Sequence, residues 1–175
     1  LVYCSLKGFL DGPYEHRAAL DEVVQMMGGL AYMTGLPDRP LRAGSSVVDI
    51  LGGTFGALGV LAALRERDAT GRGKRVTSAL FESTAYLVAQ HMAQYEITGE
   101  APPPMSVKRP AWGVYDIFET ADGGRLFVGV VTDTQWEIFC REFGEPELAA
   151  DTRLRSNGDR VKERQWLIPR LGSFT

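Results

Sequence analysis

The chain has 175 residues, of which 45% are hydrophobic and 23% charged, and these proportions exclude a disordered chain and are ordinary for a globular protein. The net charge of −3 and a pI near 5.5 give no general attraction to nucleic acid or to an anionic membrane, so we expect neither as a partner. No run approaches the roughly 20 apolar residues of a membrane span, and no leader sequence is recognised. Cys4 and Cys140 lack the spacing of zinc sites or disulfide scaffolds, and we expect a cytoplasmic protein.

The first residues, LVYCSL, predict a strand buried on both faces, as in a parallel sheet. A glycine-rich loop follows at residues 7–13, and apolar residues keep helical spacing over 18–34. A second helix is expected from residue 49 to about 67, then a short strand or helix start at VTSAL, and a third helix over 81–95. Both ends of the chain read as elements of a packed core, so we expect a fragment of a longer protein.

Four prolines in residues 99–110 predict an extended linker. Beyond it, residues 112–132 read as two strands around an Ala-Asp-Gly-Gly turn, followed by a helix that Thr132 or Asp133 caps and Gly144 ends. We therefore divide the chain into part of a large α/β domain at 1–98, the linker at 99–110, and part of a small α+β domain at 111–175.

One acid, Asp49, lies between apolar residues and a glycine pair in SSVVDILGG. Its neighbours Val47, Val48, Ile50 and Leu51 predict a water-poor surrounding, where an unpaired carboxylate costs free energy. Asp49 is therefore either a helix cap or a working group, and spacing alone favours the cap. Repeated glycines weaken the following helix by about 1 kcal/mol each, a loss usually tolerated where another backbone or a ligand approaches closely.

Six segments, taken in order, resemble the class III CoA-transferases (CaiB/BaiF type), which include formyl-CoA and carnitine-type transferases and α-methylacyl-CoA racemases. The segments are VYCSLKGF with GPY, ALDEVVQMMGGLAYMTG, VVDILGG, LGVLAALRERDATGRGKRVTSALFE, YDIFETADGG, and TDTQWEIFCREFG with ELAADTRL. Each is weakly specific alone, and their common order over almost the whole chain carries the resemblance. It implies a Rossmann-like large α/β domain followed by a small α+β domain, in a middle portion of a protein more than twice as long.

The resemblance implies that Asp49 is a nucleophile that attacks the thioester carbonyl of an acyl-CoA. CoA would then pass to a carboxylic acid through an aspartyl anhydride and an aspartyl-CoA thioester. A carboxylate is ionised at neutral pH and needs no partner base for this role. We expect backbone N–H groups around Gly52 and Gly53 to stabilise the oxyanion, and these glycines to leave room for the acyl group.

The resemblance also implies a CoA thioester as substrate, no permanently bound cofactor and an interlocked homodimer. Lys7 and Arg17 are candidate CoA contacts, and Asp21 aligns with a commonly acidic position beside the active site. GRGKR, at residues 71–75, lacks the spacing of a P-loop and is interpreted as a solvated turn. No metal site is expected, because the two histidines, His16 and His91, are isolated.

Two alternatives remain beside the transferase. In the racemase branch a histidine directly precedes the acid at the position of Asp21, whereas Leu20 stands here, which removes one of the two bases that proton exchange needs. His16 and Asp21 also form an H-x4-D pattern like that of some glycerolipid acyltransferases, but a spacing of five does not bring the two side chains together on a helix. The other alternative is a non-catalytic acyl-CoA-binding relative in which Asp49 only caps its helix. The formyl-CoA branch has a glycine run just before the hairpin, whereas this chain has PMSVKRPAWG at that place. This difference disfavours oxalate and formate as substrates.

Overall fold

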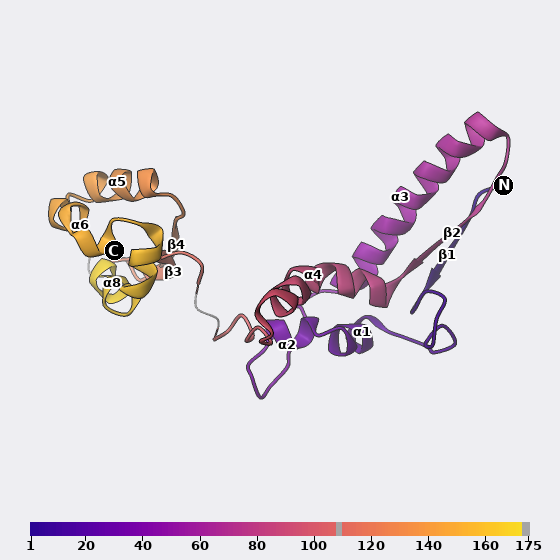
Figure 1. The fold of residues 1–175 in the computed structure, drawn as a ribbon, viewed down its shortest axis with the longest axis horizontal. Helices are drawn as coiled ribbons and strands as arrows, with labels where there is room; N and C mark the ends of the chain where they lie inside the picture. The colour runs from indigo at the N-terminus through magenta and orange to yellow at the C-terminus, as the bar shows by residue number, and fades with distance from the viewer. Residues whose placement is uncertain (108–109, 173–175) are drawn as a thin grey trace. The chain divides into compact units, whose positions relative to one another are not determined.

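The computed structural model describes residues 1–107 and 110–172, and it divides into two compact units, Leu1–Lys108 and Arg109–Thr175 (Figure 1). Each unit combines helices with a two-stranded sheet, which confirms the expected α/β class. Residues 108 and 109 of the predicted linker, and residues 173–175, lie outside the described residues.

The sheet of the first unit pairs β1 (Tyr3–Lys7) with β2 (Arg75–Ala79) in parallel, with Tyr3 opposite Arg75 and Lys7 opposite Ala79. The predicted parallel strand is confirmed. Its burial on both faces is not, since Tyr3 is 59% and Leu6 63% exposed. Among the described residues this sheet has two strands, so the outer edge of each has no strand beside it, and α3 packs on the sheet.

Four helices complete the first unit: α1 (Asp21–Met27), α2 (Leu30–Thr34), α3 (Val47–Thr70) and α4 (Leu80–Thr98). The single helix expected over 18–34 is wrong, because the chain breaks between α1 and α2 at Gly29, which has φ +84°. The preceding Gly28 packs so closely on α4 that an added Cβ would lie 2.4 Å from the Thr84 Cγ2 atom. The break therefore follows from the glycine pair, one residue for the turn and one for the contact.

Helix α3 runs alongside the two strands (Figure 1) and approaches them through glycines. A Cβ added at Gly56 would lie 2.9 Å from Leu6 Cδ2, and one at Gly59 would lie 2.6 Å from Val76 Cγ1. Below the start of α3, Phe9, Val24 and Val48 form a buried cluster between the loop after β1, α1 and α3. Gly56 and Gly59 thus allow α3 to lie close to the two strands, as the repeated glycines predicted.

Helix α3 is also apolar over much of its surface. The expectation that no stretch approaches a membrane span is wrong by length and composition, because an 18-residue window of α3 has a mean hydropathy of 1.9 and is 22% buried. The helix nevertheless packs on an open two-stranded sheet, whose edge N–H and C=O groups hydrocarbon cannot satisfy. We therefore interpret α3 as a packing helix of a folded unit.

The proline-rich segment after α4 returns to α2. Its Pro102 and Pro104 are buried, the backbone N–H of Met105 donates to the carbonyl of Met33 at 2.9 Å, and Ser106 Oγ donates to the carbonyl of Gly35 at 2.6 Å. These contacts fasten residues 102–106 to the first unit.

The second unit is built on a hairpin of β3 (Val114–Glu119) and β4 (Arg125–Val130), as predicted, with Gly123 at φ +79° in its turn. Around it lie α5 (Asp133–Glu142), α6 (Pro146–Ala150), the short 3₁₀ helix η1 (Thr152–Leu154), α7 (Asn157–Lys162) and α8 (Arg164–Leu171). Thr132 caps α5 in a reciprocal pair with Gln135, and Gly144 follows its end at φ +66°. Both assignments agree with the sequence.

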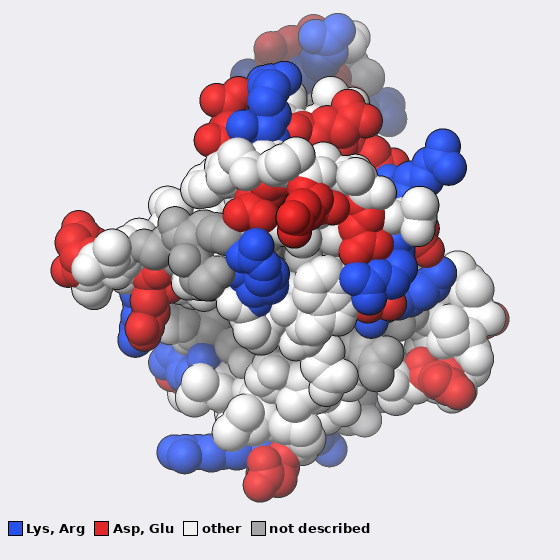
Figure 2. Space-filling view, turned by 90° about the vertical axis from the view of Figure 1, so that its left-hand side faces the viewer, with Lys and Arg blue, Asp and Glu red and all other residues white. Residues whose placement is uncertain are grey.

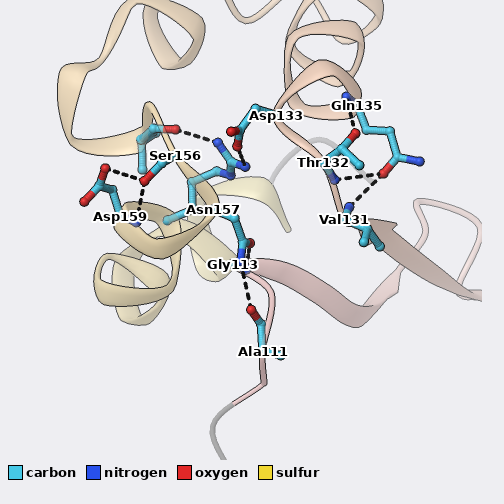
Figure 3. A network of polar contacts seen from close by, with 11 residues as sticks. Ala111, Gly113, Val131, Thr132, Asp133, Gln135, Ser156, Asn157 and Asp159 are labelled. Carbon is cyan, nitrogen blue, oxygen red and sulfur yellow. Dashed lines mark hydrogen bonds and ion pairs between the residues drawn. The ribbon is translucent and has the colours of Figure 1, made fainter.

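A polar network joins the parts of this unit (Figure 3). The Asn157 side chain donates to the carbonyl of Ala111 at 2.9 Å and accepts the N–H of Gly113 at 3.1 Å, so it holds the segment that enters β3. Acidic and basic side chains adjoin one another on the face that Figure 2 shows. Within the second unit, Arg153 forms an ion pair with Asp151. The second unit is therefore tied by its own side chains.

Candidate active site

Asp49 is the third residue of α3, and its carboxylate projects from the first turn of the helix into an exposed position. It lines a cavity of about 370 Å³ whose other walls are Leu6, Lys7, Gly8, Ala19, Gly52, Gly53, Ser78, Ala79 and Leu80. Lys7 and Ala79 end β1 and β2, so the cavity opens at the carboxyl ends of the parallel strands, where α/β sheets commonly bind ligands.

The surroundings of Asp49 are wetter than expected. Ile50 is 63% exposed, and of the apolar neighbours only Val48 is fully buried. In the described part of the chain, no donor lies within hydrogen-bond distance of the Asp49 carboxylate. The Asp49 carboxylate therefore faces solvent and the cavity without a hydrogen-bond partner among the described residues.

The cap of α3 comes from another helix. One carboxylate oxygen of Asp21, Oδ2, accepts the backbone N–H of Val48 at 2.9 Å and that of Asp49 at 3.3 Å. The other two amides of the first turn, those of Val47 and Ile50, donate to backbone carbonyls just upstream. The hypothesis that Asp49 caps its own helix is therefore wrong.

Asp21 is only 4% exposed, and its second oxygen is also engaged. Gln25 Nε2 donates to Asp21 Oδ1, while Gln25 Oε1 accepts the N–H of Ala43 at 2.9 Å. The Arg42 guanidinium lies 3.9 Å from the same Oδ1 and also pairs with Glu22. The buried charge of Asp21 is thus compensated by two amides, a side-chain amide and a nearby cation.

The two glycines after Asp49 differ in what surrounds them. A Cβ at Gly52 would lie 3.2 Å from the Leu80 side chain, whereas a Cβ at Gly53 would meet nothing within 4 Å. Because α3 begins at Val47, both residues lie beyond its first turn and their N–H groups donate within the helix. The expectation that these amides stabilise the oxyanion is therefore wrong. The expected free space is present beside Gly53.

Of the six candidate residues, the structure gathers four around one cavity, namely Lys7, Asp49, Gly52 and Gly53. Lys7 also forms an ion pair with the exposed Asp11, with 3.3 Å between Nζ and Oδ1. Arg17 does not line the cavity, and its guanidinium lies 4.7 Å from the centre of the Tyr14 ring. Asp21 does not line the cavity, and it contacts α3 through the capping bonds to the amides of Val48 and Asp49.

Sequence reasoning missed two residues that shape the cavity. Glu82, in the first turn of α4, accepts the backbone N–H of Leu10 at 3.1 Å and so holds the loop after β1. Ser78 Oγ donates to the carbonyl of Gly52 at 2.8 Å and ties β2 to α3. A glutamate at a helix start and a serine in a strand are too common for either contact to be read from the pattern.

Among residues 1–107 and 110–172, no group of three His, Cys, Asp or Glu side chains is placed to hold a metal ion. Cys140 belongs to the core of the second unit, and burial raises the pKa of its thiol to about 11. Leu20, at the place of the racemase histidine, is 68% exposed and precedes α1 without any side-chain cap.

Comparison with known proteins identifies the class. The model of CoA-transferase family III matches residues 1–175, and the chain belongs to this family, as its sequence motifs predicted. It is 32% identical over 177 residues to the succinyl-CoA–D-citramalate CoA-transferase of Chloroflexus aurantiacus and 33% identical over 181 residues to the succinyl-CoA:mesaconate CoA-transferase of Haloarcula hispanica. These matches cover 100% of this chain and 44% and 45% of the relatives.

Solved structures agree. A CAIB/BAIF family protein from Brucella suis superposes with a TM-score of 0.79 at 33% identity, covering 100% of this chain and 47% of that protein. A protein from Mycobacterium tuberculosis gives 0.78 at 25% identity, covering 97% and 45%. The chain thus spans less than half the length of these relatives.

Proposed function

We propose that the full-length protein containing this chain transfers CoA between an acyl-CoA thioester and a carboxylic acid, with Asp49 as the nucleophile. The observation that carries the proposal is the Asp49 carboxylate, which lines a cavity at the carboxyl ends of two parallel strands and is free because Asp21 supplies the helix cap. The named activities of its relatives support CoA transfer in general.

The chemistry proceeds by four substitutions at carbonyl carbon. An Asp49 oxygen attacks the thioester carbonyl and the C–S bond breaks. The CoA thiolate departs, and a mixed anhydride of Asp49 and the acyl group is formed. The thiolate then attacks the aspartyl carbonyl, which releases the donor acid and forms an aspartyl-CoA thioester. The acceptor carboxylate attacks that thioester and frees the thiolate again. Attack of the thiolate on the acceptor carbonyl yields the new acyl-CoA and restores the Asp49 carboxylate.

We propose a short dicarboxylic acid as one substrate. Relatives carry the names succinyl-CoA:mesaconate CoA-transferase, succinate–glutarate CoA-transferase and acetyl-CoA:oxalate CoA-transferase, all of which name a dicarboxylic acid. Lys7, which lines the same cavity as Asp49 and whose ammonium pairs with the exposed Asp11, is the cation that we assign to the distal carboxylate. An acceptor panel of succinate, glutarate, mesaconate and monocarboxylic acids of equal length tests this assignment.

Chemical trapping tests the nucleophile. The full-length protein is mixed with succinyl-CoA or acetyl-CoA, stopped rapidly with hydroxylamine, digested, and mapped by mass spectrometry. A hydroxamate or a CoA adduct on Asp49 supports the proposal. An unmodified Asp49 in protein shown to bind CoA contradicts it and favours the binding-only alternative.

The racemase alternative has a separate test. Exchange of deuterium at the α-carbon of a 2-methylacyl-CoA, without an acceptor acid, would reveal proton transfer in place of CoA transfer. We expect no exchange, because Leu20 stands where the racemase branch has a histidine.

We further propose that the full-length protein is a homodimer. The support is the apolar surface that α3 and α4 leave open in this chain, which includes Leu58, Leu61 and Tyr86, each more than half exposed. Light scattering coupled to size-exclusion chromatography tests the proposal, and a monomeric mass would contradict it.

A further inference from the structure

We infer that Asp21 is a positioning residue that keeps the Asp49 carboxylate available for attack, an inference that rests on the proposed function. Asp21 Oδ2 accepts the N–H of Asp49 itself at 3.3 Å and that of Val48 at 2.9 Å. The residue that normally caps a helix at this place, Ser46, makes no side-chain capping bond. The first turn of α3 therefore depends on an acceptor from α1.

The inference follows from what Asp49 would do without that acceptor. An aspartate in the first turn of a helix readily bonds to nearby backbone N–H groups, and a carboxylate held in this way is a weaker nucleophile. Asp21 occupies the amides of Val48 and Asp49 from the buried side of the helix. The Asp49 carboxylate is then left without a local donor and faces the cavity.

Asp21 is well placed for this role because it is buried and held by other side chains. It is 4% exposed, Gln25 donates to its Oδ1, and the Arg42 guanidinium lies 3.9 Å away. Gln25 and Arg42 also bind the segment that leads into α3, through Ala43. The residue does not line the cavity, so it acts on substrate only through Asp49.

Substitutions in the full-length protein test the inference, with succinyl-CoA as donor. We expect Asp21→Ala to lower kcat at least about tenfold with the KM for succinyl-CoA within about threefold, because capture of Asp49 by its own amides slows the chemical step. Asp21→Asn should recover most of the loss, since its amide oxygen can still accept the N–H of Val48. The rate of hydroxylamine capture on Asp49 should fall and recover in parallel.

The control is Val88→Ala, a cavity-forming change at a buried position of α4 that does not line the cavity at Asp49. Assayed below its Tm, it should keep kcat within about threefold, which separates positioning from general loss of stability. An unchanged kcat in Asp21→Ala overturns the inference. So does an Asp21→Asn variant as slow as Asp21→Ala, because the charge of Asp21 would then matter in its own right.

If Asp21→Ala does not fold, the inference is tested on Asp21→Asn instead. Both kcat and the amide hydrogen exchange of residues 45–53 are then measured. Faster exchange of the Val48 and Asp49 amides together with a lower kcat supports positioning, and faster exchange with an unchanged kcat overturns it. Asp49→Ala is measured alongside. If Asp49→Ala retains turnover, the proposed function itself fails, whereas an inactive Asp49→Ala beside a fully active Asp21→Ala refutes only the positioning role.

Discussion

The carboxylate of Asp21 lies 3.3 Å from the backbone nitrogen of Asp49, and it performs the capping that the sequence pattern assigns to Asp49. Two acids that are 28 positions apart thus divide two roles at one helix start. One is buried and fully bonded, and the other is exposed and unpaired. The cap of the helix and the proposed nucleophile are therefore different side chains, and removing the Asp49 carboxylate should not remove the cap.

Removal of the Asp49 carboxylate should abolish turnover and leave the fold intact. We expect Asp49→Ala to lower kcat by about 10³-fold or more, because no other described carboxylate lines the cavity. The free energy of unfolding should fall by less than about 1 kcal/mol, since only a favourable interaction with the helix dipole is lost. Steady-state kinetics and thermal unfolding of the full-length variant check both parts. A large loss of stability would contradict the division of roles described above.

The glycines of α3 should respond to substitution in opposite ways. Gly59→Ala places a Cβ 2.6 Å from the stiff Val76 side chain and should destabilise the protein by about 1–3 kcal/mol. Gly53→Ala meets open space and should stabilise the helix by up to about 1 kcal/mol. Its new methyl group enters the cavity wall, so we expect a several-fold lower kcat/KM for bulky acyl groups. Urea unfolding and kinetics with acyl-CoA substrates of increasing size measure these effects, and equal stability losses in both variants would contradict the assigned packing.

Lys7 should contribute to the binding of an anionic substrate group. We expect Lys7→Met to raise the KM for a dicarboxylic acceptor by about tenfold, equivalent to about 1.4 kcal/mol, with kcat little changed. Lys74→Met is the matched control, because Lys74 forms a comparable surface ion pair with Glu66, 2.5 Å between Nζ and Oε2, away from the cavity. A monocarboxylic acceptor should show no such difference between the two variants. Equal effects in both would point to the loss of a surface ion pair and not to substrate binding.

The Cys140 thiol should be inert in the folded protein. Burial raises its pKa from 9.0 to about 11, so it stays protonated at pH 8 and alkylates slowly. The sign of the linkage follows: the folded state favours the protonated thiol, so this contribution to stability is complete below pH 9 and is lost as the pH rises through 11. Iodoacetamide labelling at pH 8, with and without urea, followed by peptide mapping, gives the measurement. Rapid labelling of Cys140 without urea would contradict its burial.

Local patterns were sufficient for most elements. The hairpin turn at Gly123 and the capping of α5 by Thr132 depend on neighbours in the sequence, and both agree with the structure. The strand pattern of β1 was also local, whereas its pairing with β2, far along the chain, was not part of the prediction. The break at Gly29 was missed because apolar spacing continues across it, and only its positive φ reveals a turn.

The candidate site was only partly predictable. Motif order was enough to select Asp49, whereas the cap from Asp21 is a tertiary contact that no spacing rule encodes. The oxyanion hypothesis for Gly52 and Gly53 failed because α3 begins two residues before Asp49, which moves both amides inside the helix. The exposure of Tyr3 and Leu6 could not be predicted either. An apolar strand pattern indicates which side chains are suited to burial, but it does not show which elements are present to cover them.

The bond from Asp21 to Val48 has a consequence for biosynthesis. Its acceptor is made 27 residues earlier than its donor, so a chain that grows from its N-terminus has already synthesised α1 when the start of α3 emerges from the ribosome. The first turn of α3 therefore needs no capping acceptor from a later part of the chain.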